Sequence, residues 1–249
     1  MNTTNNTILI TGGGSGIGFE MAKLLSEKGN QVIIIGRTKS KLDKAAAQLK
    51  NVTAIAADIT KEKDITDLAE RLKKEFPNLN GIINNAASAY LYALDVETNA
   101  FDKAQDEMLT NYLSVIRLTS TLLPALRTQA EAFIINVSSI VAFVPGHKLP
   151  TYSASKAALH SYTQTLRLSL SHTSVKVFEL MPPLVDTEFS KEVGGSNGIK
   201  PSVVAEDLLK ALDANQYEIR VGMTEAMYQL SLSSPEEAFN AMNEQTQKA

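Results

Sequence analysis

The sequence contains no cysteine, which excludes disulfides, thiolate metal sites and cysteine nucleophiles. It also lacks any apolar run near the roughly 18 residues that a membrane-spanning helix needs. The first ten residues, MNTTNNTILI, contain neither a basic segment nor a long apolar one, so no signal peptide is expected. These absences predict a soluble protein, most simply one of the cytoplasm.

Positive charge is not in excess either. The formal net charge is −3 and the isoelectric point is near 5.7, which offers no basic surface for nucleic acid and no polybasic patch for a membrane. The acidic residues and the three histidines show no clustering typical of a metal site, so no metal is expected. The length of 249 residues fits one large α/β domain or two small ones.

Short β-branched segments alternate with longer amphipathic ones. Strands are expected at residues 7–10, 31–36, 52–58, 81–87, 132–139, 175–180 and 218–222, and helices at 18–28, 39–49, 61–75, 101–126, 152–171 and 202–214. This alternation predicts an α/β fold with a doubly wound parallel sheet and helices on both faces. Because no repeat or linker is present, residues 1–249 are expected to form one domain. Residues 186–200 are expected to be a loop or lid, and those after 222 a tail.

A glycine-rich turn, TGGGSGIG, follows the first strand and opens the first helix at residues 11–18. Glycine allows positive φ and close approach of a pyrophosphate, and the helix N-terminus adds N–H groups and a positive dipole. No Gly-Lys-Ser/Thr follows, which excludes a P-loop. Gly12, Gly16 and Gly18 are spaced G-x-x-x-G-x-G rather than G-x-G-x-x-G. A dinucleotide site is predicted, and a turn without a ligand is the alternative.

This turn and the motifs after it resemble the short-chain dehydrogenase/reductase family, in the family's order and over nearly the whole chain. The matching motifs are ADIT with Asp58, NNAA at 84–87 with Ala87 in place of glycine, Asn111 in a helix, Ser139 thirteen residues before Tyr152, and the Y-x-x-x-K pair Tyr152 and Lys156. The segments PPLVDT, YEIRVG and SPEEAFNAMN are similar to the DltE-like branch. The resemblance implies a single-domain Rossmann fold and hydride transfer between a nicotinamide and a carbonyl or alcohol.

Tyr152 and Lys156 lie four residues apart, so on a helix they share a face. A free tyrosine has a pKa of about 10, and a nearby ammonium is expected to lower it. By the resemblance, Tyr152 donates the proton in reduction and Lys156 binds the nicotinamide ribose and tunes Tyr152. Ser139 holds the substrate oxygen, and Asn111 anchors a proton-relay water. For a tyrosine taken alone, packing is the alternative role.

The resemblance also implies the cofactor contacts. They are Gly12, Ser15, Gly16, Ile17, Gly18, Arg37, Asp58, Ile59, Asn85, Ala86, Tyr152, Lys156, Pro182, Val185 and Thr187. The second strand ends in Gly36 and Arg37 with no acid before Asp43, which favours NADP(H), with NAD(H) possible. Ser15 is neutral where some NADP-dependent relatives are basic, and Pro183 stands where the family usually has glycine.

Other residues are weaker candidates. His147, Tyr90 and Tyr92 are candidates for the lining of a substrate pocket, with ordinary packing as the alternative. His160 and His172 are expected to be surface or packing residues.

The leading hypothesis is a carbonyl reductase or alcohol dehydrogenase acting on a small molecule. The alternatives are a catalytically silent dinucleotide-binding regulatory or scaffold protein on the same fold, and another chemistry of the family such as epimerisation or dehydration.

A homodimer or homotetramer is expected, because helices in family relatives pair across a two-fold axis. Two expected helices carry apolar residues beyond what one sheet face needs, namely Met108, Leu109, Tyr112, Val115, Leu159, Tyr162 and Leu166.

Overall fold

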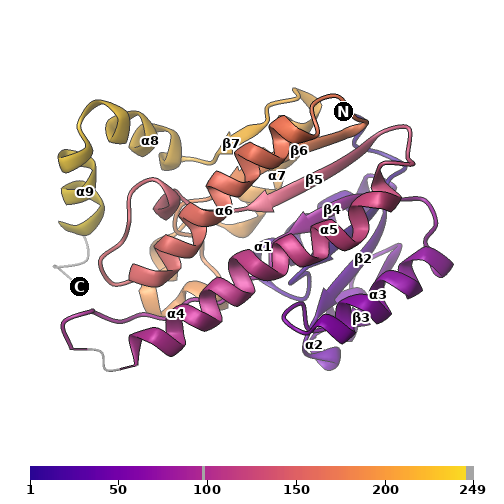
Figure 1. Ribbon diagram of the computed structural model, residues 1–249, viewed down its shortest axis with the longest axis horizontal. Coiled ribbons are helices and arrows are strands. Elements are labelled where there is room, and N and C mark those ends of the chain that lie inside the picture. The colour runs from indigo at the N-terminus through magenta and orange to yellow at the C-terminus, as the bar shows by residue number, and fades with distance from the viewer. Residues whose placement is uncertain (97–98, 245–249) are drawn as a thin grey trace.

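A computed structural model describes residues 1–96 and 99–244. Its centre is a parallel sheet of seven strands in the order β3-β2-β1-β4-β5-β6-β7 (Figure 1). The strands are β1 (Thr7–Thr11), β2 (Gln31–Gly36), β3 (Val52–Ala56), β4 (Leu79–Asn84), β5 (Ala132–Val137), β6 (Val175–Met181) and β7 (Glu218–Arg220). The prediction of a doubly wound parallel sheet is confirmed.

Helices cover both faces of this sheet. The described helices are α1 (Gly16–Glu27), α2 (Lys39–Ala46), α3 (Glu62–Glu75), α4 (Ala100–Met108), α5 (Ser114–Leu126), α6 (Pro150–Ser169) and α7 (Pro201–Asp213), followed by α8 (Met223–Ser233) and α9 (Pro235–Glu244), which lie outside the two faces. None of the described helices is both long and apolar enough to cross a membrane.

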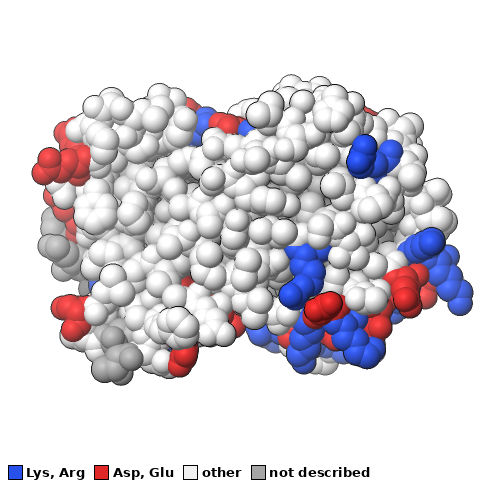
Figure 2. Space-filling model, viewed as in Figure 1, with Lys and Arg blue, Asp and Glu red and all other residues white. Residues whose placement is uncertain are grey.

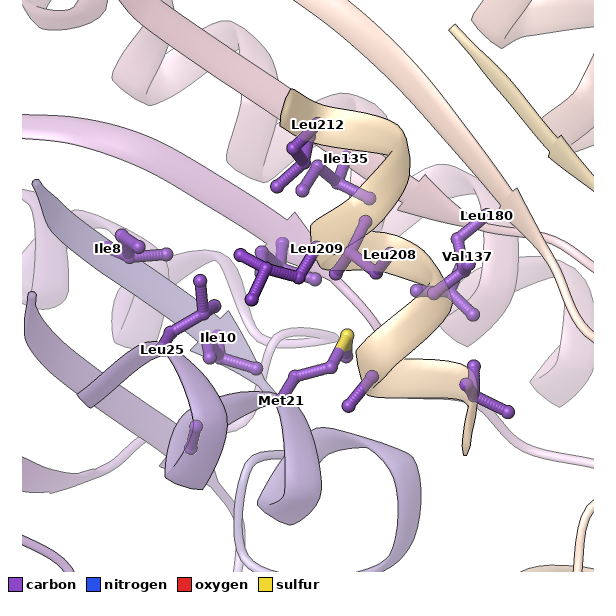
Figure 3. Packing of buried hydrophobic residues seen from close by; sticks show 14 of the residues in the cluster. Ile8, Ile10, Met21, Leu25, Ile135, Val137, Leu180, Leu208, Leu209 and Leu212 are labelled. Atoms are coloured by element: carbon purple, nitrogen blue, oxygen red, sulfur yellow. The ribbon is translucent and has the colours of Figure 1, made fainter. Parts of the chain in front are cut away.

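The two faces of the sheet bury separate apolar clusters. Successive residues of a strand point to opposite faces, so Ile8 and Ile10 join one cluster and Leu9 joins the other. In the first cluster α1 and α7 meet over the sheet, with Met21 and Leu208 between them (Figure 3). The second cluster is covered by α3, α5 and α6. Strands buried on both faces explain the near-continuous apolar runs of the sequence.

The strand order reverses between β1 and β4. From β1 the chain winds outward through β2 to β3, and from β4 it winds the other way to β7. Parallel strands all end at the same edge, so the loops after β1 and β4 leave toward opposite faces there. A ligand crevice is expected at this point of an open α/β sheet.

The helix expected at 101–126 is interrupted by a π-helical turn, Leu109–Leu113, between α4 and α5. A π turn inserts one residue without changing the apolar pattern on either side, so periodicity did not reveal it. Such turns often occur at functional sites, and this one carries Asn111.

Residues 223–244 form two helices rather than a tail, which corrects the sequence prediction for this part of the chain. Helices α8 and α9 pack together beyond the carboxyl ends of the strands, at the left of Figure 1. They form a third apolar cluster in which Met227 and Ala238 contact Ile140 and Val144, with Tyr152 packed against it. Each helix is short and buries few residues, so its sequence pattern was too weak to indicate a helix.

The segment 186–200, expected to be a loop or lid, contains two 3₁₀ turns, Glu188–Val193 and Gly195–Asn197. Thr187 and Ser190 form a reciprocal capping box, and a bridge between Val185 and Ile199 closes the base of the segment. Gly194 joins the two turns with a φ of 78°, a conformation that favours glycine.

Candidate functional site

A cleft opens at the carboxyl edge of the sheet, where the loops after β1 and β4 separate. It brings together most of the residues that the sequence indicated, namely Gly12, Ser15, Gly16, Ile17, Arg37, Asp58, Ile59, Asn85, Ala86, Tyr152, Lys156, Pro182 and Thr187. Two predicted contacts do not line it: Gly18 lies behind the turn, and the side chain of Val185 is buried in the cluster under α1 and α7.

Some lining residues were missed by the sequence analysis. They are Ile35, Gly36, Ala57, Thr60, Ala87, Thr110, Val137, Ser138, Glu188 and Phe189. Several of them follow or end a strand at the carboxyl edge, and that position was the signal that could have found them. Thr110 had no such signal, since it comes from the π turn, whereas Glu188 and Phe189 lie in the segment 186–200 that was expected to be a lid.

The glycine turn is packed so closely that side chains would not fit. Gly12 and Gly16 have φ values of 66° and 55°. A Cβ atom at Gly18 would lie 2.4 Å from the carbonyl oxygen of Gly12. No side chain caps the N-terminus of α1, so its N–H groups remain directed at the cleft. This cradle and helix terminus suit a pyrophosphate, so the residues present fit a dinucleotide.

Thr11 joins the two halves of the fold beside this turn. Its hydroxyl accepts hydrogen bonds from the backbone N–H groups of Asn85 and Ala86, each at 2.9 Å. The Asn85 side chain donates in return to the carbonyl oxygen of Thr11, also at 2.9 Å. The loops after β1 and β4 are therefore held at a fixed separation.

Arg37 and Asp58 lie at the β2 and β3 end of the cleft. Burial acts to raise the pKa of Asp58, but hydrogen bonds from Thr60 and the charges of Arg37 and Lys61 hold it below its ordinary value. The Thr60 hydroxyl donates to Asp58 at 2.7 Å and its N–H donates at 3.0 Å. Asp58 is thus a fixed negative group, and Arg37 is an exposed positive one beside it.

Tyr152 and Lys156 extend from α6 into the cleft one turn apart. Lys156 is 2% exposed, and its Nζ donates to the carbonyl oxygen of Val137 at 2.8 Å. Burial lowers the pKa of Lys156 to about 8, while the negative charge of Glu179 acts to raise it.

The expected lowering of the tyrosine pKa is not what the cleft produces. Burial raises the pKa of Tyr152, a hydrogen bond with Ser139 opposes the rise, and the charge of Glu107 adds to it. The Nζ of Lys156 lies 5.5 Å from the centre of the Tyr152 ring and is bound to Val137, so its charge does not outweigh burial. The cleft therefore holds a neutral phenol, the form that can donate a proton.

Ser139 follows β5 and caps the 3₁₀ turn Ile140–Ala142, with its hydroxyl accepting from the N–H of Val141 at 3.3 Å. This cap and the hydrogen bond with Tyr152 orient the serine at the strand end.

Asn111 is fully buried beneath the cleft and does not line it. Its Oδ1 accepts from the N–H of Ser88 at 2.8 Å, and its Nδ2 donates to the carbonyl oxygen of Ser88 and to Ser155 Oγ at 2.8 and 2.9 Å. Asn111 thus joins the segment after β4 to α6. Both amide hydrogens are engaged, so a relay water would have to be held by an oxygen of this residue.

Glu107, which the sequence analysis missed, is fully buried near these residues. It accepts a hydrogen bond from the N–H of Tyr90 at 2.8 Å and another from the Thr151 hydroxyl. The Tyr92 hydroxyl lies 2.6 Å from Thr151 Oγ1. Burial raises the pKa of Glu107. Neither tyrosine lines the cleft. Tyr92 and Glu107 meet Thr151 at the N-terminus of α6, whereas the exposed Tyr90 side chain donates to Asp106 at 3.1 Å.

The histidines have different environments. His147 is exposed, and its N–H donates to Asn243 of α9 at 2.7 Å. His172 is exposed, as expected. His160 is more than a surface or packing residue, because its Nδ1 lies 2.9 Å from the buried carboxyl group of Glu179. Within the described ranges, no group of three or more His, Cys, Asp or Glu side chains is placed to hold a metal ion.

Comparisons with known proteins agree with this geometry. Residues 6–197 match the family model of the short chain dehydrogenases. The chain is 36% identical to the uncharacterized oxidoreductase DltE of Bacillus subtilis (strain 168), over 98% of this chain and 99% of the relative.

Two solved structures share the fold of this chain. A short chain dehydrogenase from Burkholderia cenocepacia J2315 in complex with NADP is 27% identical with a TM-score of 0.86, covering 97% of this chain and 98% of that one. A 3-ketoacyl-(acyl-carrier-protein) reductase from Brucella melitensis complexed with NADH is 26% identical with a TM-score of 0.76, covering 84% and 91%. With the matching family model and the similar relatives, the chain belongs to the short chain dehydrogenase family of oxidoreductases.

Proposed function

We propose that this protein is an NADP(H)-dependent carbonyl reductase or alcohol dehydrogenase acting on a neutral small molecule. The observation that carries the proposal is that Tyr152 and Lys156 share one cleft with the glycine turn after β1. A proton donor and a dinucleotide cradle are the two parts that hydride transfer to a carbonyl requires. A catalytically silent binding protein on the same fold is the competing function.

The residues would act as follows in the direction of reduction. The N–H groups at the start of α1 hold the pyrophosphate, and the ammonium group of Lys156 meets the ribose hydroxyls. Nicotinamide, when bound, supplies the hydride. The Ser139 hydroxyl orients the substrate carbonyl oxygen, and Tyr152 transfers its phenolic proton to that oxygen as negative charge develops there. The phenolate left behind is stabilised by the nearby positive charge of Lys156.

Three features support NADP(H) over NAD(H). Arg37 is the charged residue at the end of β2, and the next acid, Asp43, is paired with Lys39 at 2.7 Å. Lys41 and Lys44 line a shallow hollow beside Ser15, which adds positive charge near the same place. A 2′-phosphate would be favoured by this charge. Relatives have been solved with NADP and with NADH, so both cofactors belong to the test.

The substrate class is inferred from the wall of the cleft. The basic residues that line it are Arg37 and Lys156, and both are assigned to the cofactor. The Phe189 ring lies 6.2 Å from the Tyr152 ring, and the lid segment 186–200 carries it. An aromatic side chain over the proton donor, with no unassigned cation among the described residues that line the cleft, suits a neutral carbonyl compound.

Self-association is proposed from the surface over α5 and α6. Few charged side chains lie there, whereas charges gather around α2 and α3 (Figures 1 and 2). Leu113 and Leu168 are 48% and 76% exposed, and the rings of Tyr112 and Tyr162 meet edge to face between the two helices. These side chains form an apolar surface suited to an isologous contact in a homodimer or homotetramer.

Not every apolar residue expected at this surface lies there. Val115 and Leu159 are 4% and 1% exposed because they pack under their own helices. The side chains of Leu113 and Leu168 take their place on the outer face.

Replacing Tyr152 with phenylalanine tests the proposed reaction. Tyr152→Phe removes the proton donor and keeps the ring, so turnover should fall about 10²- to 10⁴-fold while NADPH affinity is nearly unchanged. The assay is oxidation of NADPH or NADH against a panel of ketones and aldehydes, and the reverse reaction with alcohols. Tyr162→Phe on the same helix is the matched control. Turnover above about a tenth of the wild-type value would exclude Tyr152 as the acid, and a wild-type protein that binds NADPH without any turnover would favour the silent binding protein.

Replacing Arg37 tests the cofactor preference. Arg37→Ala removes a charge-assisted hydrogen bond worth roughly 1.5–3 kcal/mol, so the Michaelis constant for NADPH should rise about ten- to a hundred-fold. The constant for NADH should hardly change. Arg71→Ala, an exposed arginine on α3, is the control. Equal losses with the two cofactors would mean that Arg37 does not recognise the 2′-phosphate.

Replacing Phe189 tests the substrate side of the cleft. Phe189 is 53% exposed, so Phe189→Ala removes about half of the roughly 1.5–3 kcal/mol of a fully buried apolar side chain, and kcat/KM for a ketone should fall about three- to ten-fold. The loss of NADPH affinity should be smaller, because the ring packs beside Tyr152, the proposed proton donor. Leu232→Ala on α8 is an exposed apolar control. An unchanged kcat/KM across the panel would remove Phe189 and its lid from substrate recognition.

Introducing a charge on α6 tests self-association. Light scattering should give a multiple of the 27.0 kDa chain mass, and Leu168→Glu should shift the protein toward the monomer by burying an unpaired charge. Leu232→Glu on α8 should leave the mass unchanged. A wild-type monomer at micromolar concentration would contradict the proposal.

A further inference from the structure

One turn beyond Lys156, α6 carries a third polar residue on the same face, His160. Its ring meets Glu179 of β6, with Nδ1 at 2.9 and 3.0 Å from the two carboxyl oxygens. The Ser138 hydroxyl donates to Oε1 of the same carboxyl group at 2.5 Å. Ser138 and Ser139 are consecutive residues after β5. The hydroxyl of Ser138 contacts Glu179, and that of Ser139 contacts Tyr152.

Glu179 occupies an unusual position for a carboxylate. It is fully buried, and Val175 and Val177 precede it on the same face of β6 in the cluster under α6. An ionised carboxylate in such a place costs several kcal/mol unless hydrogen bonds and an opposite charge compensate it. Ser138 and His160 supply the hydrogen bonds. Lys156 is joined to the same strand end, because its Nζ donates to the carbonyl oxygen of Val137, the residue before Ser138. The negative charge of Glu179 acts on this ammonium group.

We propose that Glu179 is a positioning residue whose carboxylate keeps Lys156 protonated at the base of the cleft. Ser138 and His160 orient this carboxylate. The proposal rests on the proposed dinucleotide-dependent function, in which the ammonium group meets the ribose and stabilises the phenolate of Tyr152.

The other charged groups near Glu179 are paired among themselves. Glu218, its register partner on β7, contacts Arg167 at 3.2 Å and also pairs with Arg220. Arg220 in turn contacts Glu225 of α8 at 3.2 Å. These two acidic and two basic groups neutralise one another.

The remaining charges belong to the cleft and its floor. Arg37, Asp58 and Glu188 line the cleft, and Glu107 acts on Tyr152 from α4. Phe143 packs edge to face on the His160 ring at 4.8 Å between ring centres, so an aromatic group covers that side of the histidine. Burial lowers the pKa of Lys156, and Glu179 is the carboxylate whose charge opposes this lowering.

The first test uses the full chain without cofactor. Lys156 has a pKa of about 8 in the folded protein, below the ordinary 10.5, so the unfolded chain holds this proton more readily. The folded state therefore gains stability from Lys156 as the pH rises from about 8 toward about 10.5. Glu179→Gln keeps the shape and the hydrogen bonds but removes the charge. The pKa of Lys156 should fall further, and the gain should begin about one pH unit lower.

The measurement is the free energy of unfolding by urea at closely spaced pH values above neutrality. Glu179→Gln should have a lower free energy of unfolding than wild type. This difference should become smaller as the pH rises through the range in which Lys156 loses its proton in the folded protein. A difference that stays constant over this range would mean a purely structural role and would overturn the proposal.

Two variants serve as controls in the same measurement. Glu218→Gln removes the neighbouring carboxylate on β7. Its free energy of unfolding should differ from that of wild type by the same amount at every pH in this range. Glu179→Asp retains the charge, so the pH at which the free energy of unfolding begins to rise should return toward the wild-type value. The specific pairing of Glu179 with Lys156 would be contradicted by either of two results. One is a pH-dependent difference in Glu218→Gln as large as that in Glu179→Gln, and the other is a Glu179→Asp curve that matches Glu179→Gln.

The second test is NADPH binding, followed by the fluorescence of the reduced nicotinamide. The loss of affinity at high pH should begin about one pH unit lower in Glu179→Gln than in wild type. Coincident curves would overturn the proposal. A wild-type protein that binds neither NADPH nor NADH would overturn the proposed function instead, while the unfolding curves would still decide whether Glu179 sets the charge of Lys156.

Discussion

The hydrogen bond from Lys156 Nζ to the carbonyl oxygen of Val137 is the contact on which the site depends. It joins the middle of α6 to the end of β5 and places an almost fully buried ammonium group at the carboxyl edge of the sheet. Burying a charge is costly, so the surroundings must compensate it closely. With the lysine held there, Tyr152 lies one turn earlier over the cleft and His160 one turn later over β6.

The same face of α6 continues this polar contact deeper into the fold. The Thr163 hydroxyl accepts from Asn136 Nδ2 at 2.9 Å, and Asn136 Oδ1 accepts from Asn84 Nδ2 at 2.8 Å. Polar side chains therefore follow the helix from the cleft to the middle of the sheet, inside an otherwise apolar layer. Because polar groups buried without partners destabilise a fold, α6 has one register in which all of these bonds form. The position of Tyr152 is a consequence of that register.

Much of the site was predictable because its motifs are local. The glycine turn needs only neighbouring residues, and the spacing of Tyr152 and Lys156 needs only a helix. Glu179 could not be predicted in this way. Its role depends on β6 lying beside β5 and beneath α6, and a single glutamate in an apolar strand carries no spacing signal. The prediction that the pKa of Tyr152 is lowered was wrong for a related reason. The sequence shows that a lysine is nearby but not how deeply both groups are buried.

The sequence by itself determined the alternation of strands and helices, the doubly wound parallel sheet, and the local motifs of the site, which are the glycine turn and the pair Tyr152 and Lys156. These follow from hydrophobic period, glycine placement and the handedness of strand crossovers, which are properties of short segments. Only the tertiary structure decided the π turn at Asn111, the two helices that replace the expected tail, and the carboxylate beneath Lys156. Each of these is settled by contacts between residues far apart in the chain, where burial rather than local preference decides which groups must pair.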